Sequence, residues 1–272
     1  MTHAARVAAG AVASCLVAAL AAAQSTPPPQ TPDATDLAKK TQNPVGDLTS
    51  VPLQFNFNQG GDYGARAGLN LNLQPVIPFR LTSKWNAILR TIVPLNTLPA
   101  ADGARESGVG DIQAQFYVTP AQPGRLIWGA GPMFSLPTAT MGLAETGSWG
   151  LGPGAVVLTM HGPWVAGGLV QQFWTVADSG GDPELNLFLF QPFVNYNLGD
   201  GWALSLSPII TANWNAASGQ KWTVPLGLGL TRTTVFNRRP MNIGVQYYSS
   251  VQRPDGSPSQ QLRFSIAWLF PR

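Results

Sequence analysis

From residue 51 onward, apolar and polar residues alternate along the chain with a period of two. Between Leu69 and Gln74, leucines alternate with Asn and Gln, and between Trp222 and Thr231 apolar residues alternate with Thr, Pro and Gly. Successive side chains of a β-strand point to opposite faces, so each such stretch predicts a strand with one apolar face. Several stretches reach about 9 to 11 residues, which a tilted strand needs to cross a bilayer.

This alternation, with the turn residues between stretches, predicts an all-β chain of about twelve strands. An even number of antiparallel strands is typical of single-chain bacterial barrels. The alternation is weakest over 149–174, where glycines interrupt it. The predicted strands are 51–58, 66–79, 84–94, 110–119, 125–137, 149–160, 163–174, 185–198, 202–214, 220–232, 240–250 and 260–270.

The connections between these strands alternate in length. Long polar connections are predicted at 96–109, 138–148, 176–184 and 252–259, and tight turns at 81–83, 161–162 and 199–201. Outer-membrane barrels place long loops outside the cell and short turns in the periplasm. We therefore predict a transmembrane antiparallel up-and-down β-barrel over residues 51–272. Both termini would lie in the periplasm of a Gram-negative bacterium.

The N-terminus has the order of a secretory signal peptide. Arg6 precedes an Ala-rich apolar run, and Ala21 to Ala23 supply a cleavage site before Gln24, which predicts a signal peptide over 1–23. A membrane anchor is one alternative, and a lipoprotein modified at the single cysteine, Cys15, is another. Residues 24–50 would form a periplasmic linker or a plug that folds into the pore. A short helix is expected there, capped by Thr35 or Asp36.

Composition narrows the class of protein further. Charged residues make up 11% of the chain, against about 25% in soluble domains, while hydrophobic residues make up 44%. The net charge of +3 comes from scattered residues, so neither a charged disordered tail nor a nucleic-acid-binding stripe is indicated. A soluble β-sandwich is the alternative, but its solvent face should carry Lys and Glu rather than the Asn, Gln, Ser and Gly seen here.

The positions of the tryptophans favour membrane strands, whereas the prolines within the predicted strands do not. Most tryptophans fall near predicted strand ends, where their rings would lie at the lipid headgroups, although some could be core residues. Prolines within strands conflict with a closed ladder, because proline has no N–H to donate. We expect them at bulges or near the rims: Pro75, Pro132, Pro192, Pro208 and Pro225.

Enzymatic chemistry, cofactors and resident metals are not predicted. His3 lies in the signal peptide and His161 in a tight turn, so no serine has an obvious imidazole base. The glycines from Gly150 to Gly154 lack the lysine and the following helix of a phosphate loop. The loop carboxylates Asp178, Asp182 and Glu184 are read as solvated charge. The alternative for them is binding of calcium or of cations that bridge lipopolysaccharide.

The inward strand face is expected to form a polar, lightly charged lumen. Twelve strands lie between the filled barrels of eight strands and the open porins of sixteen or more, so a narrow or plugged pore is expected. The candidate lumen residues are Arg90, Asp111, Gln113 and Arg263. The two arginines would either set the electrostatics of the lumen or pair with polar neighbours and stiffen the wall.

Several motifs, in order along the mature chain, resemble a bacterial outer-membrane barrel family. They include Lys39–Leu48, Gln74–Pro78, Leu136–Thr140, Gln191–Tyr196 and Trp222–Gly227. The family is named for a phenol-degradation (MetA) pathway, and its members are often labelled transporters or "neuromedin U". The resemblance implies a membrane barrel and, more loosely, transport of small organic solutes. No catalytic residues carry over.

These observations predict an outer-membrane channel or transporter for small organic solutes, with aromatic or hydrophobic compounds as the candidates. A non-conducting structural or adhesin-like barrel that acts through its long loops is the alternative. The expected partners are outer-membrane lipid, lipopolysaccharide and the solute. The last strand, which ends in Phe270, resembles the signal read by barrel-assembly machinery, although Pro271 and Arg272 follow it.

Overall fold

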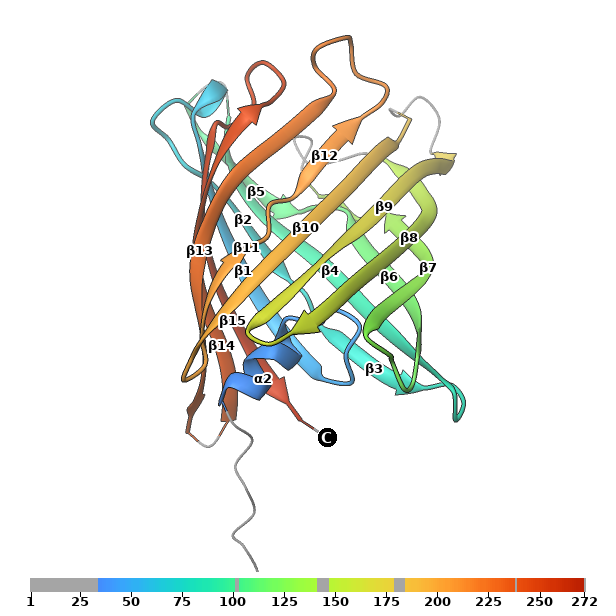
Figure 1. Ribbon diagram of the computed structural model, residues 1–272. Coiled ribbons are helices and arrows are strands. Elements are labelled where there is room, and N and C mark those ends of the chain that lie inside the picture. The colour runs from blue at the N-terminus through green and yellow to red at the C-terminus, as the bar shows by residue number, and fades with distance from the viewer. Residues whose placement is uncertain (1–33, 101–102, 141–146, 179–183, 238, 272) are drawn as a thin grey trace, which may run out of the picture. The chain divides into compact units, whose positions relative to one another are not determined.

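The computed structural model describes residues 34–100, 103–140, 147–178, 184–237 and 239–271. The predicted signal peptide lies outside these ranges. The described chain from residue 34 onward forms one antiparallel sheet that closes on itself (Figure 1). β1 (Thr49–Gln59) and β15 (Gln260–Phe270) close it, with Thr49 opposite Phe270 and Gln59 opposite Gln260. A closed sheet leaves no unpaired edge, which a bilayer would not tolerate.

The barrel has twelve strands, as the sequence predicts. Its ladder contains fifteen segments, but three strands are each split into two consecutive segments. The split strands are β2 (Gly68–Leu73) with β3 (Val76–Arg80), β5 (Arg105–Val109) with β6 (Ile112–Pro120), and β11 (Trp202–Leu206) with β12 (Ile210–Asn213). The unsplit strands besides β1 and β15 are β4 (Trp85–Pro99), β7 (Leu126–Leu136), β8 (Ser148–His161), β9 (Trp164–Asp178), β10 (Asn186–Gly199), β13 (Trp222–Phe236) and β14 (Arg239–Gln252).

Three of the five prolines predicted within strands lie at irregularities. Pro75 separates β2 from β3, Pro208 lies between β11 and β12, and the β13–β14 register shifts between Val224 and Pro225. The expectation of bulges and breaks is confirmed at these positions. At each of them the strand is interrupted or shifted beside a residue that cannot donate to the ladder.

Pro132 instead lies within an unbroken strand, directly opposite Pro153 in the β7–β8 pair. The ladders that join this hairpin to its outer neighbours, β6 and β9, are interrupted nearby. In the β6–β7 pair, the ladder is interrupted between the Gln115–Met133 pair and the Val118–Ala130 pair. The β8–β9 partners likewise skip from Leu151–Trp174 to Gly154–Gln171. The missing proline N–H groups therefore weaken the ladders on both sides of the β7–β8 hairpin.

The two mouths of the barrel differ in their connections. The turn mouth has connections of two to five residues, at 81–84, 121–125, 162–163, 200–201 and 237–238. The loop mouth has connections of five to eleven residues, at 60–67, 100–104, 137–147, 179–185, 214–221 and 253–259, and only 100–104 is as short as the longest turn. The alternation of loop lengths is confirmed. The long loop predicted over 96–109 is wrong, because β4 continues to Pro99 and β5 begins at Arg105.

The described ends of the chain both lie at the turn mouth, where the C-terminus and the helix α2 (Ala34–Thr41) are found (Figure 1). Short turns face the periplasm in outer-membrane barrels, so this is the periplasmic side.

The outer face of the barrel carries an apolar belt between two girdles of tryptophan. Seven of the nine tryptophans are exposed. Near the turn mouth, Trp85 and Trp128 stack edge to face at 6.0 Å, and Arg232 lies 4.9 Å from the Trp202 ring centre. Near the loop mouth, Trp214 and Trp222 stack at 5.3 Å. This arrangement is that of a transmembrane β-barrel of the outer-membrane type. Among the described residues, no helix is long and apolar enough to span a bilayer.

Candidate functional site: the barrel lumen and its N-terminal plug

Residues 34–48, here called the plug, fold into the turn mouth. Leu37 and Leu48 pack against Leu269 of β15. Val45 is only 4% exposed and belongs to the apolar cluster inside the barrel. The side-chain amides of Gln42 and Asn197 exchange hydrogen bonds of 3.0 and 3.2 Å. These two small apolar contacts and the amide pair help to hold the plug in the mouth.

The helix in the plug is the short helix that the sequence predicts. Its described residues are Ala34–Thr41, so the predicted caps Thr35 and Asp36 lie within the helix. The helix ends with Lys39 and Lys40 in its last turn. An acidic first turn and a basic last turn both complement the helix dipole.

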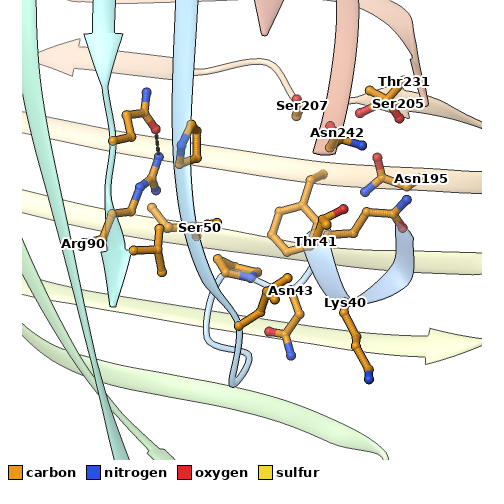
Figure 2. A pocket seen from close by; sticks show the side chains of 18 of the residues that line it. Lys40, Thr41, Asn43, Ser50, Arg90, Asn195, Ser205, Ser207, Thr231 and Asn242 are labelled. Atoms are coloured by element: carbon orange, nitrogen blue, oxygen red, sulfur yellow. Dashed lines mark hydrogen bonds between the residues drawn. The ribbon is translucent and has the colours of Figure 1, made fainter. Parts of the chain in front are cut away.

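Three cavities follow one another along the lumen. The loop-side cavity is about 380 Å³, the middle cavity about 200 Å³, and the plug-side cavity about 270 Å³. The loop-side and middle cavities share Gln54, Asn72 and Ile209. The middle and plug-side cavities share four lining residues: Gln74, Arg90, Leu169 and Gln191. Plug residues from Lys40 to Pro44 line the last cavity, so the plug lies at its periplasmic end (Figure 2).

Arg263 is fixed in the wall of the loop-side cavity and is 3% exposed. Its Nε donates to Asn56 Oδ1 at 3.0 Å and its Nη2 to Gln261 Oε1 at 3.0 Å. Its Nη1 donates to the Ser207 carbonyl and to Gln246 Oε1 at 3.3 and 3.4 Å. The guanidinium also lies 4.9 Å from the Tyr248 ring centre. Arg263 therefore stiffens the wall by joining several strands.

An amide network extends from Arg263 across the neighbouring strands. Asn56 Nδ2 donates to Asn70 Oδ1 at 3.0 Å, and Asn70 Nδ2 donates to Asn96 Oδ1 at 2.8 Å. Asn72 Nδ2 donates to the same Asn70 oxygen at 2.8 Å. We call this side of the lumen, on β1, β2 and β11 to β15, the polar wall.

Arg90 is held much less completely. Its Nη2 donates to Gln74 Oε1 at 2.5 Å, and Gln74 Nε2 donates onward to Gln54 Oε1 at 2.9 Å. Arg90 lines both the middle and the plug-side cavities, to which its side chain is partly exposed. Within the described ranges it has no ion pair with a carboxylate. In Figure 2 it lies across the cavity from Asn195 and Ser205, with plug residues between.

Asp111 and Gln113 line the middle cavity together with Arg90. Asp111 Oδ1 accepts the backbone N–H groups of Thr138 and Ala139 at 3.0 and 3.1 Å. This carboxylate therefore anchors the chain that follows β7. All four lumen residues proposed from the sequence line cavities, but only Arg90, Asp111 and Gln113 share one.

The opposite side of the lumen is apolar, which the sequence reasoning missed. Inward side chains of β4 and β6 to β10 form a cluster with Val45 of the plug, and we call this side the apolar wall. The prediction of a uniformly polar lumen is wrong here. Runs such as Ala155 to Leu158, apolar on both faces, were the available signal. The strand members of the cluster are Ile88, Tyr117, Met133, Val156, Leu158, Val165, Leu169, Phe173 and Phe193.

A small polar network is buried at the edge of this apolar wall. Gln171 Nε2 donates to the Tyr117 hydroxyl at 3.1 Å, and Gln115 Nε2 donates to Gln171 Oε1 at 3.4 Å. Gln115 Oε1 has no partner among the described atoms. The network lies beside the middle cavity, which both glutamines line.

Among the described residues, the groups considered for enzyme or metal chemistry are not gathered into one site. His161 is the last residue of β8 at the turn mouth, and among the described residues it has no hydrogen bond with a serine. In the part of the chain that is described, no three His, Cys, Asp or Glu side chains gather as a metal site requires. Asp182 lies outside the described residues, and Glu184 is exposed.

Comparison with solved structures places this geometry among outer-membrane barrels. The chain is similar to the COG4313 outer membrane channel from Pseudomonas putida F1, with a TM-score of 0.64 at 13% identity. That alignment covers 82% of this chain and 96% of the other. It is also similar to the NanC porin, with a TM-score of 0.52 at 10% identity, covering 82% and 100%. At such identities the likeness shows the fold alone. No protein-family model and no curated protein sequence matches the chain.

Proposed function

We propose that this protein is an outer-membrane channel for small organic solutes whose periplasmic mouth is closed by the plug. The main observation that supports this proposal is the series of three lumen cavities, the last of which is lined by residues 40–44 of the plug. A barrel filled with side chains along its whole length would not leave such spaces. The two similar structures are those of an outer membrane channel and a porin, which supports this function.

The solute class follows from the lumen walls and from the family resemblance. A path between an amide-lined wall and an apolar wall suits compact molecules with one apolar side, including aromatic ones. The motif resemblance to the phenol-degradation family points the same way. In this scheme residues 1–23 are a signal peptide, 24–50 contain the plug, and 51–272 form the channel. β15, ending at Phe270, would be read by the assembly machinery.

Conductance of the mature chain, residues 24–272, in planar bilayers tests this function. We expect small, intermittent openings from the intact chain, because the plug closes one mouth. Deletion of 34–46 should raise the mean conductance several-fold, because it removes the plug from the periplasmic mouth. The deletion leaves β1 and its pairing with β15 intact, so the barrel can still close. A chain lengthened by two glycines at the tip of the 214–221 loop is the matched control and should conduct like the parent.

The opposite result is equally readable. If the deleted form inserts and resists heat denaturation but remains sealed, the lumen does not conduct. A non-conducting structural role through the long loops would then be the better interpretation.

A further inference from the structure

Among the described charged residues, Arg90 is distinguished by lining two lumen cavities, the middle one and the plug-side one. The guanidinium carries five N–H donors, and Gln74 Oε1 is the one acceptor it contacts among the described residues. Arg263, in the wall of the loop-side cavity, uses its donors on four acceptors. Among the described residues, most Arg90 donors therefore have no protein acceptor, although the side chain lines two cavities.

The local charge balance around Arg90 is positive. Among the described residues, the other charged side chains that line its two cavities are Asp111 in the middle cavity and Lys40 in the plug-side cavity. Asp111 already accepts two backbone N–H groups, and no acidic residue lines the plug-side cavity. A cation in a narrow lumen of low dielectric attracts anions more strongly than one on an open surface.

The surroundings of Arg90 also select the shape of the anion. Leu169 lines both cavities with Arg90, Leu189 lines the middle one, and Phe193 the plug-side one. Gln191 also lines both cavities and has a side-chain amide that can donate a hydrogen bond. A planar guanidinium matches a carboxylate through two parallel hydrogen bonds, while an apolar surface suits a hydrocarbon body.

We infer that Arg90 forms a lumen binding site for small amphipathic carboxylates. The carboxylate would bind the guanidinium and Gln191, and the apolar body would lie against Leu169 and Phe193. This inference rests on the proposed channel function and narrows its solutes to organic anions with a compact apolar body.

Block of ion current by benzoate, with neutral benzamide as the shape-matched probe, tests the site. The plug-deleted channel is used so that conductance is measurable. We expect benzoate to block at lower concentration than benzamide. Arg90→Gln should raise the half-blocking benzoate concentration about tenfold and leave benzamide unchanged, because only the charge-assisted contact is lost.

Two further variants separate charge from geometry. Arg90→Lys keeps the charge but loses the two-point contact, so its benzoate block should lie between those of the parent and Arg90→Gln. Arg232→Gln makes the same charge change on the lipid-facing side, over Trp202, and should block like the parent. Chloride should not compete at concentrations where benzoate blocks.

Failure of this inference is distinguishable from failure of the channel function. If the channel conducts but Arg90→Gln keeps full benzoate block, the carboxylate site is wrong and the channel stands. If chloride competes as well as benzoate, the amphipathic selectivity is wrong. If nothing conducts, saturation-transfer NMR of benzoate with the detergent-solubilised intact barrel decides the site independently. Equal signals for the parent and Arg90→Gln would then overturn it.

Discussion

The two walls of the lumen reach stability by different physical means. On the polar wall, Arg263 and the asparagines exchange hydrogen bonds across neighbouring strands, and the β14–β15 ladder runs without a gap from Met241–Trp268 to Ser249–Gln260. On the apolar wall, packing replaces these bonds, and the ladders beside Pro132 and Pro153 are interrupted. The two arginines show the same contrast. A buried cation with four acceptors is structural, whereas one with a single acceptor is available to a solute.

The largest expected effect comes from removing the centre of the polar wall. Arg263→Met should lower the free energy of unfolding by about 3 kcal/mol, because several buried acceptors lose a charged donor together. Urea unfolding in detergent micelles, followed by tryptophan fluorescence, measures it. Arg232→Met is the control and should cost less than about 1 kcal/mol, since it loses only a cation–π contact. Similar losses for both variants would contradict the wall role.

The next effect breaks the link between the apolar wall and the plug. Val45→Asp places a carboxylate in the apolar cluster, a burial that costs several kcal/mol unless the plug leaves. We expect the plug of this variant to be cleaved by protease at least tenfold faster, and the conductance to rise toward that of the deletion. Val45→Thr keeps the shape without the charge and should give a much smaller change. An unchanged cleavage rate in Val45→Asp would show that the plug does not depend on this contact.

A smaller effect is expected from a glycine of the apolar wall. A Cβ added at Gly152 would lie 1.8 Å from the Gln172 carbonyl oxygen, so the β8 and β9 backbones must move apart. Gly152→Ala should therefore destabilise the barrel by about 2 kcal/mol. Gly124→Ala is the matched control, because a Cβ there meets nothing within 4 Å. The difference between their urea midpoints is the measurement, and equal midpoints would refute the close approach.

The smallest effect concerns the interrupted ladders themselves. Backbone amides of 115–118 and 171–174 should exchange with solvent deuterium about tenfold faster than those of the β14–β15 ladder, because local opening needs fewer hydrogen bonds to break. Hydrogen exchange read by mass spectrometry in micelles resolves these peptides. Equal protection on both sides would mean that packing compensates for the missing donors.

Much of the barrel was predictable because the pleat of a strand produces alternation directly. Strand number, the order of long and short connections, and the outward tryptophans all follow from it. The length of β8 and β9 was less evident, because inward glycines such as Gly150 and Gly152 read as neither apolar nor polar. Pro75 and Pro208 were the only sequence signals of split strands, and they mark two of the three splits.

The site was predictable in its residues but not in their roles. Arg90 and Arg263 occupy the same kind of inward position on an alternating strand. What separates them is the set of acceptors supplied by Asn56, Ser207 and Gln246, which come from three other parts of the chain. The apolar wall was hidden for a similar reason, since Val45 of the plug meets its strands only after the barrel forms.

The β1–β15 seam has a consequence for the time course of assembly. Asn56 and Arg263, which bond across it, are 207 residues apart in sequence. Contacts between such distant residues form slowly, and until they form the edge of β1 remains open to pairing with another chain. The first strand of the chain must therefore wait for the last. We expect the Arg263 contacts to form after the rate-limiting step, so that their loss accelerates unfolding and leaves the folding rate nearly unchanged.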